Sequence, residues 1–228
     1  MRVVSWNLQH GVPDPEDAPD LGRALGPLAD LRADVYALQE LDQGLERTRL
    51  VDQVALVADA VGGVAVPAPA FQRGNGTYGN ALVVRGEVAD AEVLPLPGPA
   101  EPRSAGLARV GVDGGEWSVA VTHLSLDPAT ALLQLELLLG ELAARPAPRV
   151  LLGDLNLEPE HVLPVTSAVG FDLASGDPTW NARRRPRRRL DHVAVAGARI
   201  TATGVHKLAV SDHLAVWADL QVDDGRPT

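Results

Sequence analysis

The chain has no cysteine, a single lysine and few aromatic residues. Without cysteine it can form neither disulfide bonds nor thiolate zinc sites, and it has no cysteine nucleophile. Its six histidines include no His-x-x-x-His pair, which argues against a helical zinc site. The Gly-x-Ser-x-Gly turn that carries the nucleophile of many serine hydrolases is also missing. These absences leave carboxylates, amides, imidazoles and arginines as the candidates for chemistry.

Long hydrophobic runs are absent as well, since no apolar stretch approaches the roughly 20 residues that a membrane-spanning helix needs. Met1 and Arg2 lead directly into the first expected strand and leave no room for a signal peptide, so we expect a cytoplasmic protein, and a monomer. The formal net charge of -10 argues against a protein that coats nucleic acid through a broad basic surface. It does not exclude an enzyme that grips a few phosphates.

A chain of 228 residues, 46% of them hydrophobic, can bury a sizeable core. We expect one domain over residues 1–222 and a disordered tail over 223–228. Helical spacing of apolar residues is clearest over 128–144, with Asp127 as the N-cap. Further elements are expected as helices over 20–31 and 52–61, and as strands over 87–94, 107–112 and 200–207.

The most informative segment is the pattern Val-Leu-Leu-Gly-Asp-Leu-Asn over residues 150–156. Asp154 and Asn156 occupy alternate positions, so on a continued strand they project from the same side. The apolar run before Gly153 is typical of a central strand in an α/β core, whose carboxyl end usually opens into a ligand site. The alternative is a simple turn that closes the strand, because Asp and Asn are common turn residues.

Four further segments end in polar side chains in the same way. The first ends in Asn7, Gln9 and His10, the second in Gln39 and Glu40, and the third in His123. The fourth is a pair of C-terminal segments that contain Asp191, Asp212 and His213. Any one such residue is more often a solvated strand end or a cap than a functional group. Five strand ends that all carry acceptor-rich side chains are better explained by one convergent site.

Seven short motifs follow one another along the chain. They are Trp-Asn-Leu (6–8), Leu-Gln-Glu-Leu (38–41), Gly-Asn-Ala-Leu-Val (79–83), Thr-His-Leu (122–124), Gly-Asp-Leu-Asn (153–156), Leu-Asp-His-Val (190–193) and Ser-Asp-His-Leu (211–214). In this order they resemble the endonuclease/exonuclease/phosphatase family, metal-dependent phosphoesterases that include deoxyribonucleases, abasic-site endonucleases, inositol polyphosphate phosphatases and neutral sphingomyelinases. The resemblance covers nearly the whole chain. It implies an α/β four-layer sandwich, in which two mixed β-sheets pack face to face and are flanked by helices.

Phosphate-ester hydrolysis needs a cation near the phosphoryl oxygens and an oriented water. Glu40 is the best candidate ligand for Mg²⁺, with Mn²⁺ as a substitute, because Mg²⁺ is typically held by one or two carboxylates, waters and phosphate. The resemblance implies that Asn7 and Asp212 also lie around the metal. It further implies that Asp154 orients or deprotonates the attacking water, and that Asn156 holds the scissile phosphate or that water.

The resemblance also assigns the histidines. His213 matches the residue that contacts the phosphate, and Asp191 is expected to pair with it, fix its orientation and raise its pKa. His123 matches a position that hydrogen-bonds a phosphoryl or leaving-group oxygen. Gln9 stands where some family members carry an acid that binds a second metal, so one-metal chemistry is expected.

Six of the twenty basic residues lie in the run Arg-Arg-Arg-Pro-Arg-Arg-Arg over 183–189. One interpretation is a solvated loop; the other is a clamp, because guanidinium groups bind phosphate in bidentate fashion. Trp180, just upstream, can stack on a base or sugar, or belong to the core. The candidate substrate-binding arginines of this run are Arg184, Arg185, Arg187 and Arg188.

The glycine-rich stretch over 73–80 lacks the lysine and the spacing of a P-loop. We interpret it as a loop before a strand over 79–84, with Asn80 as a further candidate for substrate binding.

The sequence thus predicts a Mg²⁺-dependent hydrolase of phosphate esters. A phosphodiesterase or nuclease, cutting as an endonuclease or an exonuclease, is the leading hypothesis and is favoured by the arginine run. A phosphatase or phospholipase acting on a small polyphosphate or lipid headgroup is the alternative, favoured by the acidic net charge and short loops. A catalytically silent binding protein on the same fold is disfavoured, because every expected family position is filled.

Overall fold

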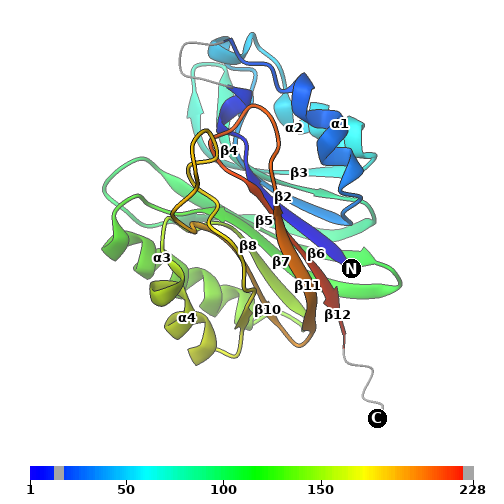
Figure 1. Cartoon of the computed structure of the whole chain (residues 1–228), viewed down its shortest axis with the longest axis vertical. Coiled ribbons are helices and arrows are strands. Elements are labelled where there is room, and N and C mark those ends of the chain that lie inside the picture. The colour runs from blue at the N-terminus through cyan, green and yellow to red at the C-terminus, as the bar shows by residue number, and fades with distance from the viewer. Residues whose placement is uncertain (13–17, 223–228) are drawn as a thin grey trace.

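The computed structural model describes residues 1–12 and 18–222, so the disordered tail expected over 223–228 lies outside the described residues. Two six-stranded β-sheets form the body of the molecule, with helices on their outer faces (Figure 1). The first sheet runs β11 (Arg199–His206), β12 (Ala215–Gln221), β1 (Arg2–Asn7), β2 (Val35–Gln43), β4 (Gly76–Val84) and β3 (Val64–Arg73). The second runs β5 (Glu87–Leu96), β6 (Arg103–Val112), β7 (Gly115–His123), β8 (Arg149–Asp154), β10 (Asp191–Ala196) and β9 (Asp172–Leu173).

Both sheets are mixed, and each contains a single parallel pair among its antiparallel neighbours. In the first sheet β1 and β2 are parallel, and α1 (Gly22–Asp30) forms the crossover between them. In the second sheet β7 and β8 are parallel, and α3 (Pro128–Ala143) plays the same part. The two sheets therefore share one design, which places the carboxyl ends of two parallel pairs where a ligand site is expected.

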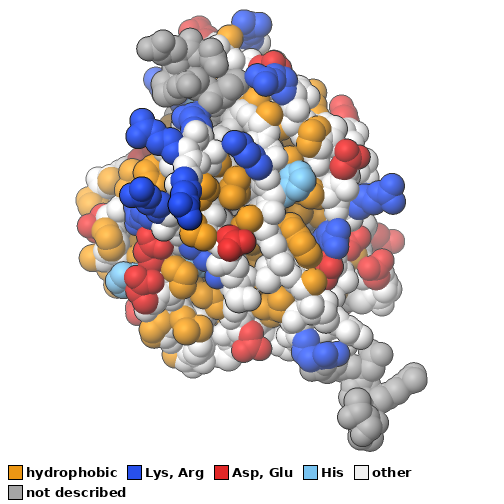
Figure 2. All heavy atoms as spheres, in the orientation of Figure 1, with side chains coloured by type: hydrophobic (Ala, Val, Ile, Leu, Met, Phe, Trp, Pro, Cys, Tyr) orange, Lys and Arg blue, Asp and Glu red, His pale blue; other side chains and the backbone are white. Residues whose placement is uncertain are grey.

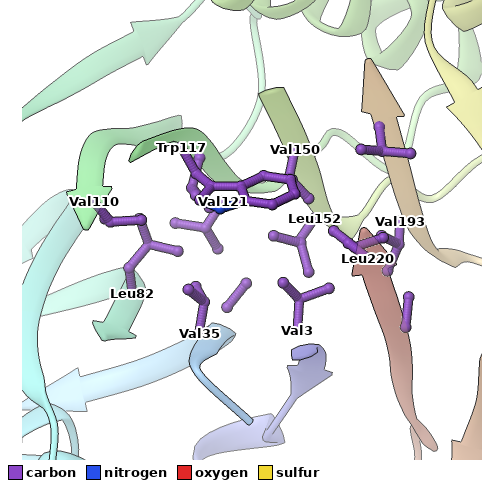
Figure 3. Packing of buried hydrophobic residues seen from close by; sticks show 14 of the residues in the cluster. Val3, Val35, Leu82, Val110, Trp117, Val121, Val150, Leu152, Val193 and Leu220 are labelled. Atoms are coloured by element: carbon purple, nitrogen blue, oxygen red, sulfur yellow. The ribbon is translucent and has the colours of Figure 1, made fainter. Parts of the chain in front are cut away.

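The space between the sheets is filled almost entirely by aliphatic side chains. Figure 3 shows Val3 and Val35 of the first sheet pointing toward Val121 and Leu152 of the second, with Trp117 beside them. Two outer clusters complete the core, one under α1 and α2 (Gln53–Val61) and one under α3 and α4 (Pro159–Ala168). The predicted four-layer α/β sandwich is confirmed. Among the described residues, no helix is long and apolar enough to cross a membrane.

The expected helices are present close to their expected bounds. Asp127 caps α3 by accepting a 2.9 Å hydrogen bond from the Thr130 backbone N–H. Asp52, expected as the first residue of a helix, is instead the N-cap of α2. The helix α1 forms despite its internal Pro27, because Ala24 and Leu28 are buried against the first sheet.

The glycine-rich stretch is not the loop that the sequence suggested. It is a tight hairpin in which only Gly74 and Asn75 form the turn between β3 and β4. Gly76 already lies in β4, where a Cβ atom would come within 2.4 Å of the Gln43 backbone oxygen. The strand β3 was not predicted from the sequence, because prolines are uncommon in strands. They are tolerated here since β3 is the edge strand of its sheet.

Candidate active site

Strand topology brings the polar strand ends to one edge of the sandwich. In the first sheet, β1 ends at Asn7, which lies in register with Gln39 of β2. In the second sheet, Asp154 at the end of β8 has His123 of β7 on one side and Asp191 of β10 on the other. Three expected site residues are thus direct neighbours across the second sheet.

Glu40 reaches the site because β2 is irregular at this point. The pairing of β2 with β4 shifts register between Leu38 and Leu41, and Glu40 has a φ of 59°. Such irregularities turn a side chain away from its ordinary face of the sheet. Leu38 and Leu41 remain buried, whereas the Glu40 side chain is 19% exposed. Its carboxylate lines the same cleft as Asp154.

Asn7 connects carboxylates from the two sheets. Its side-chain nitrogen donates to Glu40 Oε1 at 2.9 Å and to Asp154 Oδ2 at 3.0 Å. Its oxygen accepts the Gln9 backbone N–H at 3.0 Å. The amide therefore fixes the relative positions of the two carboxylates.

Two histidines flank Asp154, and their environments drive their pKa values in opposite directions. His123 Nε2 lies 3.5 Å and His213 Nε2 lies 3.7 Å from Asp154 Oδ2. Burial lowers the pKa of His123 to about 3, so its ring is neutral at neutral pH. Burial also lowers the pKa of His213, but the charges of Asp191 and Asp154 outweigh it and raise the pKa to about 10. The site therefore holds one neutral imidazole and one imidazolium.

Asn156 does not continue the strand, contrary to the expectation that it shares a strand face with Asp154. β8 ends at Asp154, and Asn156 lies in a turn with a φ of 53°. Its backbone N–H donates to Asp154 Oδ1 at 3.1 Å, which is the Asx turn weighed as an alternative. Its side-chain nitrogen donates to the Leu124 oxygen at 3.0 Å. The turn holds one oxygen of Asp154, while the other faces the two histidines.

A cleft of about 430 Å³ opens over these residues. The expected site residues that line it are Glu40, His123, Asp154, Asn156, Trp180, Arg188, Asp212 and His213. Several further residues line the cleft although the sequence predicted no role for them, namely His10, Arg47, Phe71, Arg73, Tyr78, Glu101, Arg103, Leu126 and Leu190. His10 was visible as a strand-end residue, but no motif distinguishes the arginines and aromatics from ordinary surface residues.

Two residues expected to contact the substrate, Asn80 and Trp180, are hydrogen-bonded within the protein, and Asn80 lies outside the cleft lining. Asn80 is buried outside the cleft lining, and its amide donates to the Ser104 oxygen of β6 at 3.0 Å. Trp180 lines the cleft, and its indole N–H donates to Asp212 Oδ2 at 3.0 Å. Trp180 therefore orients Asp212 and presents part of its ring to the cleft.

Several arginines line the cleft or belong to the arginine run that contributes to it. Arg188 pairs with Glu158 at 2.7 Å and lies 6.0 Å from the ring centre of Trp180. Arg188 is exposed, and so are Arg184, Arg185 and Arg187 of the same run. Basic side chains gather over the long segment between β9 and β10 in Figure 2, although the chain carries a net charge of -10. The cleft itself is also lined by Arg47, Arg73 and Arg103.

The donor atoms at the site fit a divalent cation. Ligand atoms of Asp154, Asp191 and His213 lie within 4.8 Å of one another and can hold a metal. His213 is, however, hydrogen-bonded to Asp191 Oδ2 at 2.8 Å and protonated, and a cationic ring repels a metal. Glu40 and Asp212 offer carboxylate oxygens within the cleft, which is the donor chemistry that hard cations prefer.

Comparisons with known proteins bear on the family and the fold of the chain. A model described as the Endonuclease/Exonuclease/phosphatase family matches residues 4–213. No curated protein sequence matches the chain. An endonuclease/exonuclease/phosphatase from Beutenbergia cavernae has a similar structure, with a TM-score of 0.81 and 24% identity over 97% of this chain and 71% of that one. A Bacteroides thetaiotaomicron protein titled as a member of the same family has a TM-score of 0.78 and 16% identity, over 98% of each chain.

A third structure is D. rerio TDP2 complexed with a single-strand DNA product. It has a TM-score of 0.74 and 18% identity, over 97% of this chain and 99% of that one. At these identities the structural matches establish a shared fold.

Proposed function

Because the chain belongs to the endonuclease/exonuclease/phosphatase family, we propose that it is a Mg²⁺-dependent phosphodiesterase that cleaves nucleic acid. The family hydrolyses phosphate esters with a divalent metal. The observation that carries the proposal is the convergence of Glu40, Asn7, Asp154 and His213 from both sheets on one cleft.

Glu40 and Asp212 are the residues proposed to hold the cation, with Asn7 orienting the Glu40 carboxylate. When bound, the cation neutralises charge on the phosphoryl oxygens. Trp180 supports this assignment, because its indole N–H fixes one Asp212 oxygen.

Asp154 is the proposed group that orients the attacking water and takes its proton. Its Oδ1 is held in the Asx turn, and Asn7 binds its Oδ2, so the carboxylate is fixed before substrate arrives. His213, as a cation, stabilises negative charge on the phosphate, and Asp191 behind it keeps the ring charged and oriented. His123, as a neutral imidazole, donates a hydrogen bond toward a phosphoryl or leaving-group oxygen.

Nucleic acid is favoured as substrate by the walls of the cleft. Arg47, Arg73 and Arg188 line the cleft together with the proposed catalytic residues and offer guanidinium groups to the phosphates of a longer substrate. Phe71 and Trp180 also line the cleft and offer ring faces for stacking of unpaired bases. The similarity to D. rerio TDP2, whose structure holds a single-strand DNA product, makes single-stranded DNA the first substrate to test.

A phosphatase acting on a small phosphorylated molecule is the second candidate. The cleft volume of about 430 Å³ lies in the range of small-ligand pockets, which favours this alternative. The net charge of -10 also favours it, because a polyanion meets repulsion from most of the surface.

A panel of substrates with added Mg²⁺ or Mn²⁺ separates the two candidates. It comprises labelled single-stranded and duplex DNA, bis(p-nitrophenyl) phosphate and p-nitrophenyl phosphate, each assayed beside Asp154→Asn enzyme as the inactive control. We expect cleavage of DNA and of the diester to exceed hydrolysis of the monoester. Hydrolysis confined to the monoester would establish the phosphatase instead.

A further inference from the structure

One imidazole in the cleft has no part in the chemistry described above. His10 lines the cleft, and its Nε2 lies 3.6 Å from Glu40 Oε2. We infer that His10 Nε2 is a ligand of the cation held by Glu40, an inference that rests on the proposed function because it presumes that Glu40 binds a metal.

The orientation of the ring suits a metal ligand. Metal-binding histidines usually donate the N–H of their second nitrogen to a carboxylate or a backbone carbonyl, which leaves the first lone pair for the metal. His10 Nδ1 lies 3.3 Å from the backbone oxygen of Glu40. In the tautomer that carries its proton on Nδ1, that proton points to the Glu40 backbone oxygen, and the Nε2 lone pair faces the Glu40 carboxylate.

The distance between the two donor atoms is also compatible with a shared cation. Ligands on an octahedral cation at about 2.1 Å are about 3 Å apart when adjacent and about 4.2 Å apart when opposite. The separation of 3.6 Å between His10 Nε2 and Glu40 Oε2 falls between these limits, and the two atoms would move about 0.6 Å closer together to share one ion as adjacent ligands.

The backbone around His10 is held in an unusual conformation. Gln9, His10 and Gly11 have successive φ angles of 49°, 53° and 71°. Residues held in such sparsely populated regions concentrate at functional sites, because the surrounding structure must stabilise them. Here Gln53 of α2 donates to the His10 backbone oxygen at 2.7 Å, and a Cβ on Gly11 would come within 2.9 Å of Leu21. The protein thus fixes the His10 ring beside Glu40.

Among residues 1–12 and 18–222, the remaining neighbours of His10 do not occupy Nε2. Arg47 Nη2 lies 3.4 Å from Nδ1, but a guanidinium can only donate, so with the proton on Nδ1 Arg47 forms no hydrogen bond there and stays on Asp42, which binds it at 2.6 and 2.7 Å. Asp42 Oδ1 lies 4.0 Å from Nδ1, and the Tyr78 ring meets the His10 ring edge to face at 5.6 Å. All these contacts involve Nδ1 or the ring itself and hold the imidazole in place.

An imidazole ligand alters the choice of metal. Imidazole suits first-row transition metals, of which Mn²⁺ is the closest to Mg²⁺ in its acceptance of oxygen ligands, whereas Mg²⁺ itself prefers an all-oxygen shell. A site built from Glu40 and His10 is therefore expected to bind Mn²⁺ more tightly than Mg²⁺.

Pulsed electron paramagnetic resonance of the Mn²⁺-loaded full chain tests the assignment, because a coordinated imidazole modulates the echo through its nitrogen. His10→Asn is the variant of choice, since asparagine tolerates a positive φ and offers no imidazole. His123→Asn is the matched control, because His123 Nδ1 is the other imidazole nitrogen near Glu40, at 3.9 Å from Oε1. Labelling histidine with ¹⁵N identifies the coupled nitrogen as imidazole.

We expect the nitrogen modulation in the wild type and in His123→Asn, and its loss in His10→Asn. Titration calorimetry should show at least a tenfold loss of Mn²⁺ affinity in His10→Asn and a smaller change for Mg²⁺. Bound Mn²⁺ without nitrogen modulation in the wild type, or modulation retained in His10→Asn, would overturn the inference and leave the proposed function standing. A wild type that binds no divalent cation would overturn both.

Discussion

His213 Nδ1 lies 2.8 Å from Asp191 Oδ2, and both side chains are buried at the edge shared by the two sheets. Burial alone would keep the ring neutral, but the charges of Asp191 and Asp154 raise the pKa of His213 to about 10. Because a raised pKa means that the cation persists up to that pH, the ring stays positively charged throughout the neutral range.

Replacing Asp191 with Asn should therefore lower the pH at which turnover begins to fall on the alkaline side of its pH profile. The substitution removes the charge that contributes most to raising the pKa of His213, so the cation should be lost at a pH at least one unit lower. The pH dependence of kcat on a phosphodiester, with metal at saturation, measures this. An alkaline limb in Asp191→Asn that coincides with the wild-type limb would contradict a catalytic imidazolium at His213.

Glu40→Gln should weaken metal binding, so that more metal is needed for activity, while leaving the fold intact. The change removes one negative charge and keeps the size of a side chain that is only 19% exposed. We expect the concentration of Mg²⁺ or Mn²⁺ needed for half-maximal activity to rise roughly tenfold or more. A metal titration of activity measures it, and Glu46→Gln, in a residue outside the catalytic cleft lining, is the matched control. Equal titration curves for wild type and Glu40→Gln would remove Glu40 from the metal site.

The fold was largely predictable because its central strands are buried and apolar, and several of them end in polar side chains. Asp154 and His123 follow uninterrupted buried strands, so their common edge follows from parallel pairing of β7 and β8. Family motifs supplied the pairing of Asp191 with His213, which are 22 residues apart in sequence.

Other parts of the site depend on geometry that no local pattern records. The register shift that turns Glu40 into the cleft is not visible in the run Leu-Gln-Glu-Leu. Arg47 and Arg103 line the cleft only because segments that are far apart in the sequence meet there. Asn80, by contrast, has a family motif around it, yet its amide is used to join β4 to β6.

Acid should destabilise the fold partly through His192. This ring is buried, its Nε2 contacts the Leu157 oxygen at 2.8 Å, and burial lowers its pKa to about 4. Because the unfolded chain binds a proton near pH 6.5 and the folded chain does so only near pH 4, stability should fall through this window as pH drops, by a few kcal/mol.

His192→Gln should reduce the dependence of the unfolding free energy on pH, since glutamine retains a donor for the Leu157 oxygen and does not titrate. Urea unfolding at several pH values between 4 and 7 measures the slope. His206→Gln, at an exposed residue, should leave the slope unchanged. The buried His123 should preserve some acid sensitivity in both variants. An unaltered slope in His192→Gln would contradict the burial argument.

The exposed arginines beside the cleft provide a test of polyanion binding. Changing Arg184, Arg185 and Arg187 to Ser should raise KM on single-stranded DNA and flatten its salt dependence, because fewer counterions are released on binding. Turnover of bis(p-nitrophenyl) phosphate should stay the same, since this substrate is too short to reach the loop.

A triple variant at other exposed arginines controls for net charge. Arg23, Arg32 and Arg85 lie outside the cleft lining, and changing them to Ser removes the same charge. The two triple variants should differ severalfold in KM on DNA. Identical KM values and salt slopes would assign the arginine run to a solvated loop and remove the main reason to prefer a nuclease.

The most direct test of the account is the rate at which labelled single-stranded DNA is cleaved across a titration of free Mg²⁺, for wild type and Asp154→Asn in parallel. The account predicts no cleavage in excess chelator, saturable recovery as Mg²⁺ is added, and a rate roughly a hundredfold lower in Asp154→Asn, whose melting temperature should match the wild type. Cleavage that persists in chelator, or an Asp154→Asn rate equal to wild type, would contradict a metal-dependent phosphodiesterase site at this edge of the sandwich.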